Sequence, residues 1–172
     1  MSRDVDIGRM TLIALMGALI FVLTALARIP IPATNGYVHL GDAAITFTAY
    51  AFGPWVAMFA GGMGTAMADV LGYPQWALFS LLIHGAQGLA MGWIVQKHIN
   101  VMTVMLSVVI GAAIVVAGYF AAGTFLVGVG AASLELIPNT LQGISGGVIG
   151  VPLYLAVRRA YPPLETHSRR AK

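Results

Sequence analysis

The sequence predicts an all-α, polytopic membrane protein with six transmembrane helices and both termini in the cytoplasm. Its 172 residues are 59% hydrophobic and only 9% charged, whereas soluble domains carry about 25% charged residues. Of the nine basic and six acidic side chains, only five lie between Met10 and Val157. The hydrophobic stretches leave room for about six spans of roughly 20 residues each. A separate soluble domain is therefore not expected.

Three parts are expected along the chain. They are a cytoplasmic N-terminal segment (residues 1–9), a six-helix transmembrane domain (residues 10–159) and a cytoplasmic tail (residues 160–172). Within the domain, turn dipeptides and polar breaks delimit the helices: the expected helices cover residues 10–27, 42–52, 55–71, 75–96, 101–127 and 133–159. A Gly-rich link at residues 128–132 precedes Ser133, which is the expected N-cap of the last helix.

The distribution of basic residues predicts the orientation. With six spans, every Lys and Arg except Arg28 falls on the side of the two termini, and an excess of basic residues marks the cytoplasmic side. This also explains the net charge of +3 without a nucleic-acid partner. Trp76 is then expected at the outer membrane interface, and Trp55 and Trp93 at the inner one, as aromatic anchors.

Small residues recur at four-residue spacing in several expected helices. Residues four apart share one helix face and allow close approach of two backbones in a membrane. We interpret these pairs as intramolecular packing surfaces in the third, fourth and sixth helices: Gly61 with Thr65, Gly64 with Ala68, Gly88 with Gly92, Gly143 with Gly147, and Gly146 with Gly150. The first helix carries a further pair, Ala14 and Ala18.

Three acids, Asp42, Asp69 and Glu135, lie near the outer face in this topology. Asp42 and Glu135 open expected helices, so helix capping is one interpretation and ligand binding the other. Asp69 ends a helix, where an acid is unfavourable for the helix dipole. It is therefore expected to pair with a partner such as Arg28 or to bind a ligand.

Further polar side chains lie deeper in the expected helices. His84 and Gln87 are three residues apart and share a helix face, as do Asn139 and Gln142, while Tyr119 lies in the outer half of the fifth helix. Polar groups inside a membrane usually face the bundle interior or a cavity. Two interpretations remain open, namely a shared pocket and structural hydrogen bonding.

The first loop, residues 28–41, is the most distinctive local feature. Pro30 and Pro32 stiffen its start, and Asn35-Gly36 is a dipeptide that tolerates positive φ in a turn. After the turn, Tyr37, His39 and Asp42 alternate with apolar residues, which predicts a short extended segment folded over the bundle. We interpret the loop as a lid over an outward-facing pocket; the alternative is an ordinary surface loop.

These motifs resemble one known family. The run PATNGYVHLGDA (residues 32–43), the Phe52-Gly53-Pro54 turn and the stretch from Gly61 to Asp69 are similar to the S components of energy-coupling factor (ECF) vitamin transporters. So are PNTLQG (residues 138–143) and GVPLY (residues 150–154). The resemblance covers residues 10–159 and is strongest to the branch with an IPxxNGYxxLGD loop.

The resemblance implies a membrane-embedded binding subunit that takes a vitamin or vitamin precursor from outside. A transmembrane T component and two cytoplasmic ATPase subunits would supply the energy, and the subunit would topple in the membrane to release its substrate inside. It also implies that Ala14 and Ala18 match the family's AxxxA motif, which docks onto the T component. No GxxxxGK[ST] phosphate loop occurs in the chain, in agreement with ATPases on separate subunits.

We therefore expect a multi-pass protein of a prokaryotic plasma membrane, surrounded by lipid, that is not an enzyme and has no cofactor and no resident metal. Aromatic rings and amides with few charges suit a pyridoxine- or hydroxymethylpyrimidine-like heterocycle, followed by cobalamin or riboflavin. The expected substrate-binding residues are Asn35, Tyr37, His39, Asp42, Asp69, His84, Gln87, Tyr119, Asn139 and Gln142.

Two alternative functions remain. A solitary carrier or channel would transport its substrate without ATPase partners. A membrane enzyme acting on lipid or quinone would need a metal site, and His39, Asp42 and Asp69 are three candidate ligands. The chain lacks the helical HxxxH or ExxH spacing of such sites, so the enzyme is the less favoured of the two.

Overall fold

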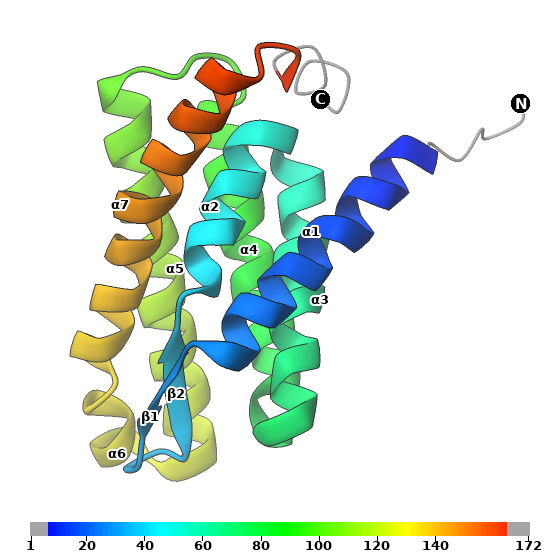
Figure 1. Ribbon diagram of the computed structural model, residues 1–172. Helices are drawn as coiled ribbons and strands as arrows, with labels where there is room; N and C mark the ends of the chain where they lie inside the picture. Colours follow the sequence, from blue (N-terminus) through cyan, green and yellow to red (C-terminus); the bar gives the residue numbers. More distant parts are fainter. Residues whose placement is uncertain (1–6, 165–172) are drawn as a thin grey trace, which may run out of the picture.

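The computed structural model describes residues 7–164 as a helical bundle with a β-hairpin at one end (Figure 1). In chain order the elements are α1 (Ile7–Leu26), β1 (Arg28–Ile31), β2 (Gly36–His39), α2 (Gly41–Phe52), α3 (Pro54–Gly72), the 3-10 turn η1 (Pro74–Trp76), α4 (Ala77–Val95), α5 (Val101–Val127), α6 (Val129–Ser133) and α7 (Leu136–Ala160). The start of α1 and the end of α7 lie at one end of the bundle, and the hairpin and α6 lie at the other.

Four segments within residues 7–164 are long and apolar enough to cross a membrane: α1, η1 with α4, α5 and α7. The 12 residues of α2 give a helix of about 18 Å, which is shorter than the apolar core of a bilayer, about 30 Å. The six-span count and the cytoplasmic side therefore remain predictions. Parts of the expected N-terminal segment and tail, residues 1–6 and 165–172, lie outside the described residues.

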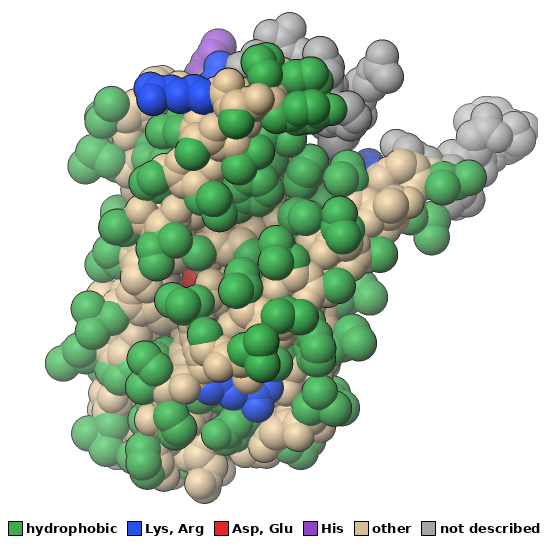
Figure 2. Space-filling model, viewed as in Figure 1, with side chains coloured by type: hydrophobic (Ala, Val, Ile, Leu, Met, Phe, Trp, Pro, Cys, Tyr) green, Lys and Arg blue, Asp and Glu red, His purple; other side chains and the backbone are tan. Residues whose placement is uncertain are grey.

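The outer surface is apolar and the interior contains polar groups. Figure 2 shows hydrophobic side chains over most of one face, with basic side chains near the end of α7 and a second basic group toward the hairpin end. In contrast, the acids Asp42, Asp69 and Glu135 are buried. This arrangement suits a molecule surrounded by lipid, where polar groups are stable only inside the bundle.

Close helix contacts confirm the packing interpretation of the small residues. A Cβ added at Gly146 of α7 would lie 2.5 Å from the Cβ of Asp42, and one added at Gly92 of α4 would lie 2.5 Å from the Cα of Pro54. Glycine at these positions therefore sets how closely α7 approaches α2 and how closely α4 approaches α3. The first-helix pair differs, because Ala14 and Ala18 are both exposed.

The first loop forms an antiparallel hairpin, as the Asn-Gly turn predicts. Arg28 pairs with His39 and Ile31 pairs with Gly36, while Asn35 in the turn has φ of 50°. Proline is compatible with this sheet because a two-stranded hairpin has only edge strands. The hairpin therefore positions alternate side chains of β2 toward the bundle.

The predicted start of the last helix is wrong. Residues 129–133 of the expected link form α6, and Ser133 ends that helix instead of capping the next one. Its hydroxyl donates to the Val129 carbonyl. Gly128, with φ of 89°, separates α5 from α6, and the alanine-rich run after it has enough helix propensity to continue as a helical turn.

Candidate binding site

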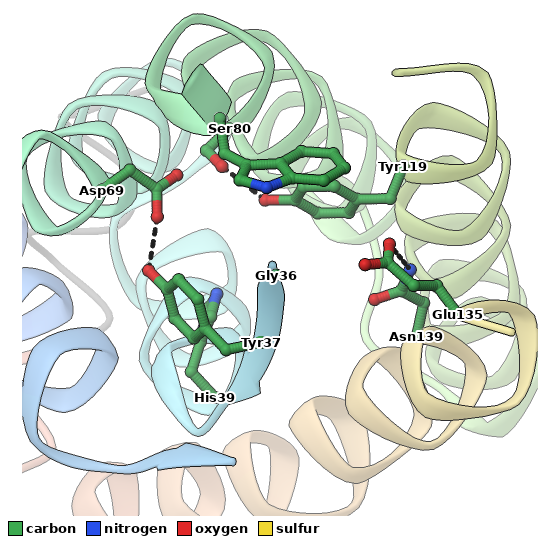
Figure 3. A pocket seen from close by; sticks show the side chains of 9 residues that line it. Gly36, Tyr37, His39, Asp69, Ser80, Tyr119, Glu135 and Asn139 are labelled. Atoms are coloured by element: carbon green, nitrogen blue, oxygen red, sulfur yellow. Dashed lines mark hydrogen bonds between the residues drawn. The ribbon is translucent and has the colours of Figure 1, made fainter. Parts of the chain in front are cut away.

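A small polar hollow lies directly beneath the hairpin. Its walls come from β2, α3, η1, α4, α5, the turn before α7, and α7 itself (Figure 3). The hollow has a volume of about 10 Å³, which is room for about one water molecule. The residues that line it are Gly36, Tyr37, His39, Asp69, Trp76, Ser80, Tyr119, Glu135 and Asn139.

Hydrogen bonds to several helices hold the hairpin over this hollow. The Tyr37 hydroxyl donates to Asp69 Oδ1 at 2.5 Å, as Figure 3 shows. The backbone N–H of His39 donates to Gln142 Oε1 at 2.8 Å, and the Thr34 hydroxyl hydrogen-bonds the Glu135 carboxylate. At the turn, Trp76 Nε1 donates to the Asn35 carbonyl at 3.2 Å. The hairpin is thus tied to α3, η1, the α6–α7 connection and α7.

Behind the hollow, Asp42, His84 and Gln87 form a second polar group. His84 Nδ1 lies 2.8 Å from Gln87 Oε1 and 3.4 Å from Asp42 Oδ1. Gln87 Nε2 donates to Asp42 Oδ2 at 3.2 Å. All three side chains are at most 1% exposed, so α2 and α4 are joined here by polar contacts shielded from lipid and water.

Aromatic rings form much of the hollow's wall. Tyr119 lies 5.8 Å from Trp76, measured between ring centroids, and its hydroxyl is 2.5 Å from the Ser80 hydroxyl. Near the rim, the guanidinium of Arg28 lies 4.8 Å from the centre of the Tyr37 ring. Such rings offer stacking surfaces for a flat ligand, and the hydroxyls beside them offer hydrogen bonds.

Burial shifts the pKa values of His39, Tyr37 and Glu135, which all line the hollow. Desolvation lowers the pKa of His39 well below its ordinary value of 6.5, and His84 and Arg28 add to the effect. Desolvation and the neighbouring Asp69 raise the pKa of Tyr37, so its phenol keeps its proton. Desolvation also raises the pKa of Glu135, opposed by hydrogen bonds from Thr34 and Asn139. The site therefore contains a neutral imidazole and a phenol donor at physiological pH.

His39, Asp42 and His84 each offer an atom able to bind a metal, and these three atoms lie within 4.8 Å of one another. Within the described residues, Asp42 Oδ1 and His84 Nε2 have no hydrogen-bond partner, whereas other atoms of these side chains are already hydrogen-bonded. His84 Nδ1 is bonded to Gln87, Asp42 Oδ2 accepts from Gln87, and His39 Nδ1 accepts from Gly41 N–H at 3.1 Å. Binding a cation through those atoms would require these bonds to break. The absence of a resident metal stays a prediction.

The structure brings nine of the ten expected binding residues to this region. Tyr37, His39, Asp69, Tyr119 and Asn139 line the hollow. Asp42, His84, Gln87 and Gln142 form its second layer through the contacts described above. The tenth, Asn35, is exposed at the hairpin turn and contributes its backbone carbonyl. A shared pocket and structural hydrogen bonding are thus both present, in successive layers.

The partners of the acids correct several expectations. Glu135 occupies the N-cap position of α7 and Asp42 lies in the first turn of α2, but neither helix has a side-chain capping hydrogen bond. The carboxylate of Asp42 accepts from Gln87, and that of Glu135 accepts from Asn139 at 3.4 Å. Asp69 pairs with Tyr37, whereas Arg28 donates to the Ala68 carbonyl at 2.7 Å.

Sequence reasoning missed three functional candidates. Trp76 is not an exposed membrane anchor, because it is 3% exposed and forms a wall of the hollow. Ser80 is four residues before His84 and seven before Gln87, so its helical spacing was a usable signal. Glu135 was considered as a helix cap or a ligand-binding group but was left out of the expected binding residues, and its contact with Thr34 joins residues 101 positions apart, which no local pattern reveals.

Comparisons with known proteins match the chain to one family model and to several relatives. Residues 5–159 match the family model for the S component of ECF-type riboflavin transporters. The chain is 44% identical over 145 residues to a protein from Pyrococcus woesei described as uncharacterised, in the gap 3' region; the match covers 84% of this chain and 98% of the relative. It is 33% identical over 156 residues to the thiamine precursor transporter HmpT of Lactococcus lactis subsp. cremoris (strain MG1363), covering 90% of each.

One solved structure supports the fold. It is the crystal structure of the S-component for biotin from an ECF-type ABC transporter, which aligns with a TM-score of 0.61 and 17% identity. The alignment covers 89% of this chain and 94% of that one. At this identity the likeness concerns the arrangement of the helices alone.

Proposed function

The chain belongs to the ECF-type riboflavin transporter S component family, and from that premise we propose that it captures a vitamin or vitamin precursor in the hollow beneath the hairpin. S components are integral membrane proteins of transporters and are not enzymes. The observation that carries the proposal is the convergence of polar side chains from β2, α3, α4, α5 and α7 at one end of an otherwise apolar molecule.

The chemistry of the site favours a small heterocycle. The names of the matching proteins refer to riboflavin, a thiamine precursor and biotin, so the names alone leave the substrate open. Aromatic walls, a neutral His39 and the Asn139 amide suit a pyridoxine- or hydroxymethylpyrimidine-like ring, with cobalamin or riboflavin as the next candidates.

Ligand entry requires the hairpin to move. A volume of about 10 Å³ is far below the several hundred Å³ of ordinary ligand pockets, about 300–1,000 Å³. The contacts of Tyr37 with Asp69 and of Thr34 with Glu135 are polar bonds that water can replace when the hairpin opens. We therefore assign the hairpin as a lid, with the hairpin end of the bundle on the extracytoplasmic side.

Energy for uptake is proposed to come from separate subunits, namely a T component and two cytoplasmic ATPases. Ala14 and Ala18 are exposed and lie in an apolar groove between α1 and α3 with a volume of about 650 Å³. Small side chains permit close helix approach in a membrane, where association depends on van der Waals contact. This groove is the proposed docking surface for the T component.

Binding to the purified protein tests the proposal. The full chain in detergent is titrated with a panel of B vitamins and their precursors while tryptophan fluorescence is recorded. Trp76 lines the hollow, whereas Trp55 and Trp93 are exposed, 40% and 48% respectively. A saturable signal that disappears in Trp76→Phe but persists in Trp93→Phe is expected. The absence of any bound or co-purified nutrient would refute the proposal.

A second assay separates the proposal from a solitary carrier or channel. Cells that express this chain alone should not accumulate the nutrient that binds to it. Uptake should appear when a T component and its ATPases are co-expressed, and it should require ATP. Uptake by the chain alone would favour the solitary carrier.

A further inference from the structure

Two buried acids lie on opposite sides of the hollow beneath the hairpin. Asp69 of α3 is 2% exposed, and Glu135, in the turn before α7, is 3% exposed. Both line the hollow, and Figure 3 shows Tyr119 between them. Acids inside a membrane protein are costly and normally have a partner. Two of them beside one cavity therefore indicate a ligand group that donates hydrogen bonds or carries positive charge.

The protein's own hydrogen bonds leave part of each carboxyl group available. Each oxygen of Glu135 accepts one hydrogen bond from another side chain, and Asp69 accepts from Tyr37 and Ser80. An ionised carboxylate has about four acceptor positions, which is more than these donors fill. Since both acids line the hollow, a ligand there can supply the remaining donors.

The hollow has no counter-ion for these acids among residues 7–164. No lysine or arginine of that range lines it, and the lowered pKa of His39 keeps this imidazole neutral. Arg28, near the rim, donates instead to the backbone carbonyls of Thr24 and Ala68, at 3.2 and 2.7 Å. An anionic ligand in the hollow would lie beside two acids and lack a counter-ion, and burial of an unpaired charge is very unfavourable.

Aromatic rings add to the attraction for a cation. Trp76 and Tyr119 both line the hollow, and their ring centroids are 5.8 Å apart. The face of an aromatic ring attracts positive charge, and the attraction is stronger where water is excluded. Acidic and aromatic side chains from α3, η1, α5 and the turn before α7 thus surround one cavity.

We propose, on the basis of the function proposed above, that the hollow selects a cationic nutrient, whose protonated nitrogen lies between Asp69 and Glu135 against the aromatic wall. A neutral analogue binds less tightly, and a phosphorylated analogue is excluded. Glu135 is thus a specificity-determining residue that contacts the ligand. Its hydrogen bond with Thr34 has the separate role of closing the hairpin.

Matched ligands test the charge preference. The first set shares the 4-amino-2-methylpyrimidine ring, with a 5-aminomethyl group (cationic), a 5-hydroxymethyl group (neutral) or the phosphate ester of that hydroxymethyl group (anionic). Pyridoxamine, pyridoxine and pyridoxine 5'-phosphate form a second set, in which pyridoxamine has the additional ammonium group. Each ligand is titrated calorimetrically into the full chain in detergent.

The expected order of affinity follows the charge. Hydrogen bonds between charged groups are roughly twice as strong as neutral ones. In a set that binds, the ammonium ligand should therefore bind at least about tenfold more tightly than the hydroxymethyl ligand. The phosphate ester should bind at least about tenfold less tightly than the hydroxymethyl ligand, because its charge has no counter-ion.

Two variants separate the charge of Glu135 from its contact with the hairpin. Glu135→Gln keeps the size of the side chain and an oxygen that accepts from Thr34, but it removes the charge. It should lower the preference for the ammonium ligand by about tenfold and change the affinity for the hydroxymethyl ligand little. Thr34→Val is the matched control, because it removes the hydrogen bond to Glu135 and leaves the carboxyl group. It should weaken both ligands by the same factor and retain the preference.

Each other outcome has a defined meaning. Equal binding of the ammonium and hydroxymethyl ligands by the native chain would overturn the inference, even if Glu135→Gln fails to fold. Tighter binding of the phosphate ester, or a full preference in folded Glu135→Gln, would also overturn it. If neither set binds but another nutrient does, the inference fails and the proposed function stands. If no member of the vitamin panel binds, both fail.

Discussion

The hollow beneath the hairpin and the α1–α3 groove are opposite kinds of surface. The hollow is about 10 Å³ in volume and is closed by hydrogen bonds between the hairpin and the helices. The groove is about 650 Å³ and is lined by methionine, phenylalanine, isoleucine and small residues. In lipid, polar contacts supply specificity and apolar faces associate only through close packing. Binding and docking should therefore be separable by mutation.

The largest expected effect comes from blocking the groove, which should abolish docking and leave nutrient binding intact. Ala18→Trp fills the groove, so complex formation with the T component and uptake should fall to background. Affinity for the nutrient should stay unchanged, because the groove and the hollow share no lining residue. Pull-down of the T component, uptake in cells and binding in detergent measure the three quantities.

Leu15→Trp is the control for this prediction. Leu15 is on the same helix and 59% exposed, but it is not among the residues that line the groove. Uptake by Leu15→Trp should resemble that of the native chain. Normal assembly of Ala18→Trp with its T component would remove α1 from the docking role.

The next effect concerns the closure of the hairpin. Tyr37→Phe removes the hydroxyl that donates to Asp69. Loss of one partner leaves a buried polar atom without its hydrogen bond, which costs about 1–3 kcal/mol, so nutrient binding should weaken by about 5- to 150-fold. Tyr161→Phe, at an exposed site, should bind normally. Unchanged affinity in Tyr37→Phe would show that this bond does not close the lid.

The helices should tolerate an added methyl group less well beside Asp42 than in the α1–α3 groove. Gly146→Ala forces a methyl group against Asp42, and such overpacking typically destabilises a protein by about 1–3 kcal/mol. Gly17→Ala, in the groove, meets its nearest atom, the Ala60 carbonyl oxygen, at an ordinary 3.7 Å. Thermal unfolding in detergent should show a lower Tm only for Gly146→Ala. Equal melting temperatures would contradict the tight packing at the polar end.

The smallest effect is a pH dependence of stability. The unfolded chain protonates His39 near its ordinary pKa of 6.5, whereas the pKa in the folded protein is lower. The free energy of unfolding should therefore decrease as the pH falls below about 6.5, until the folded pKa is reached. The contribution from one such group is at most about 1.4 kcal/mol per pH unit.

His39→Phe isolates this contribution. The raised pKa of Glu135 acts in the opposite direction, stabilising the folded protein as the pH falls, but it does so in both proteins. The difference in the slope of Tm against pH thus belongs to His39. Identical slopes would show that His39 titrates equally in the folded and unfolded chains.

Local sequence features predicted the helices and the hairpin well. Gly53-Pro54 separates α2 from α3, and Asn35-Gly36 forms the turn, because these residues restrict the backbone locally. The start of α7 was missed because residues 129–133 form a helical turn that neither glycine content nor the Ser133 cap pattern predicts. The role of Trp76 was missed because a tryptophan near a helix end suits both an interface and a buried wall.

The sequence alone determined that this protein resides in a membrane and that its few polar side chains must be inside, because lipid cannot solvate them. It could not determine which of those groups meet. Only the tertiary structure decided that Asp42 lies beside His84 and Gln87, and that Gln142 receives the N–H of His39. The physical reason is that the polarity of each side chain by itself indicates whether lipid can surround it. Its hydrogen-bond partners, in contrast, depend on how helices distant in sequence approach one another.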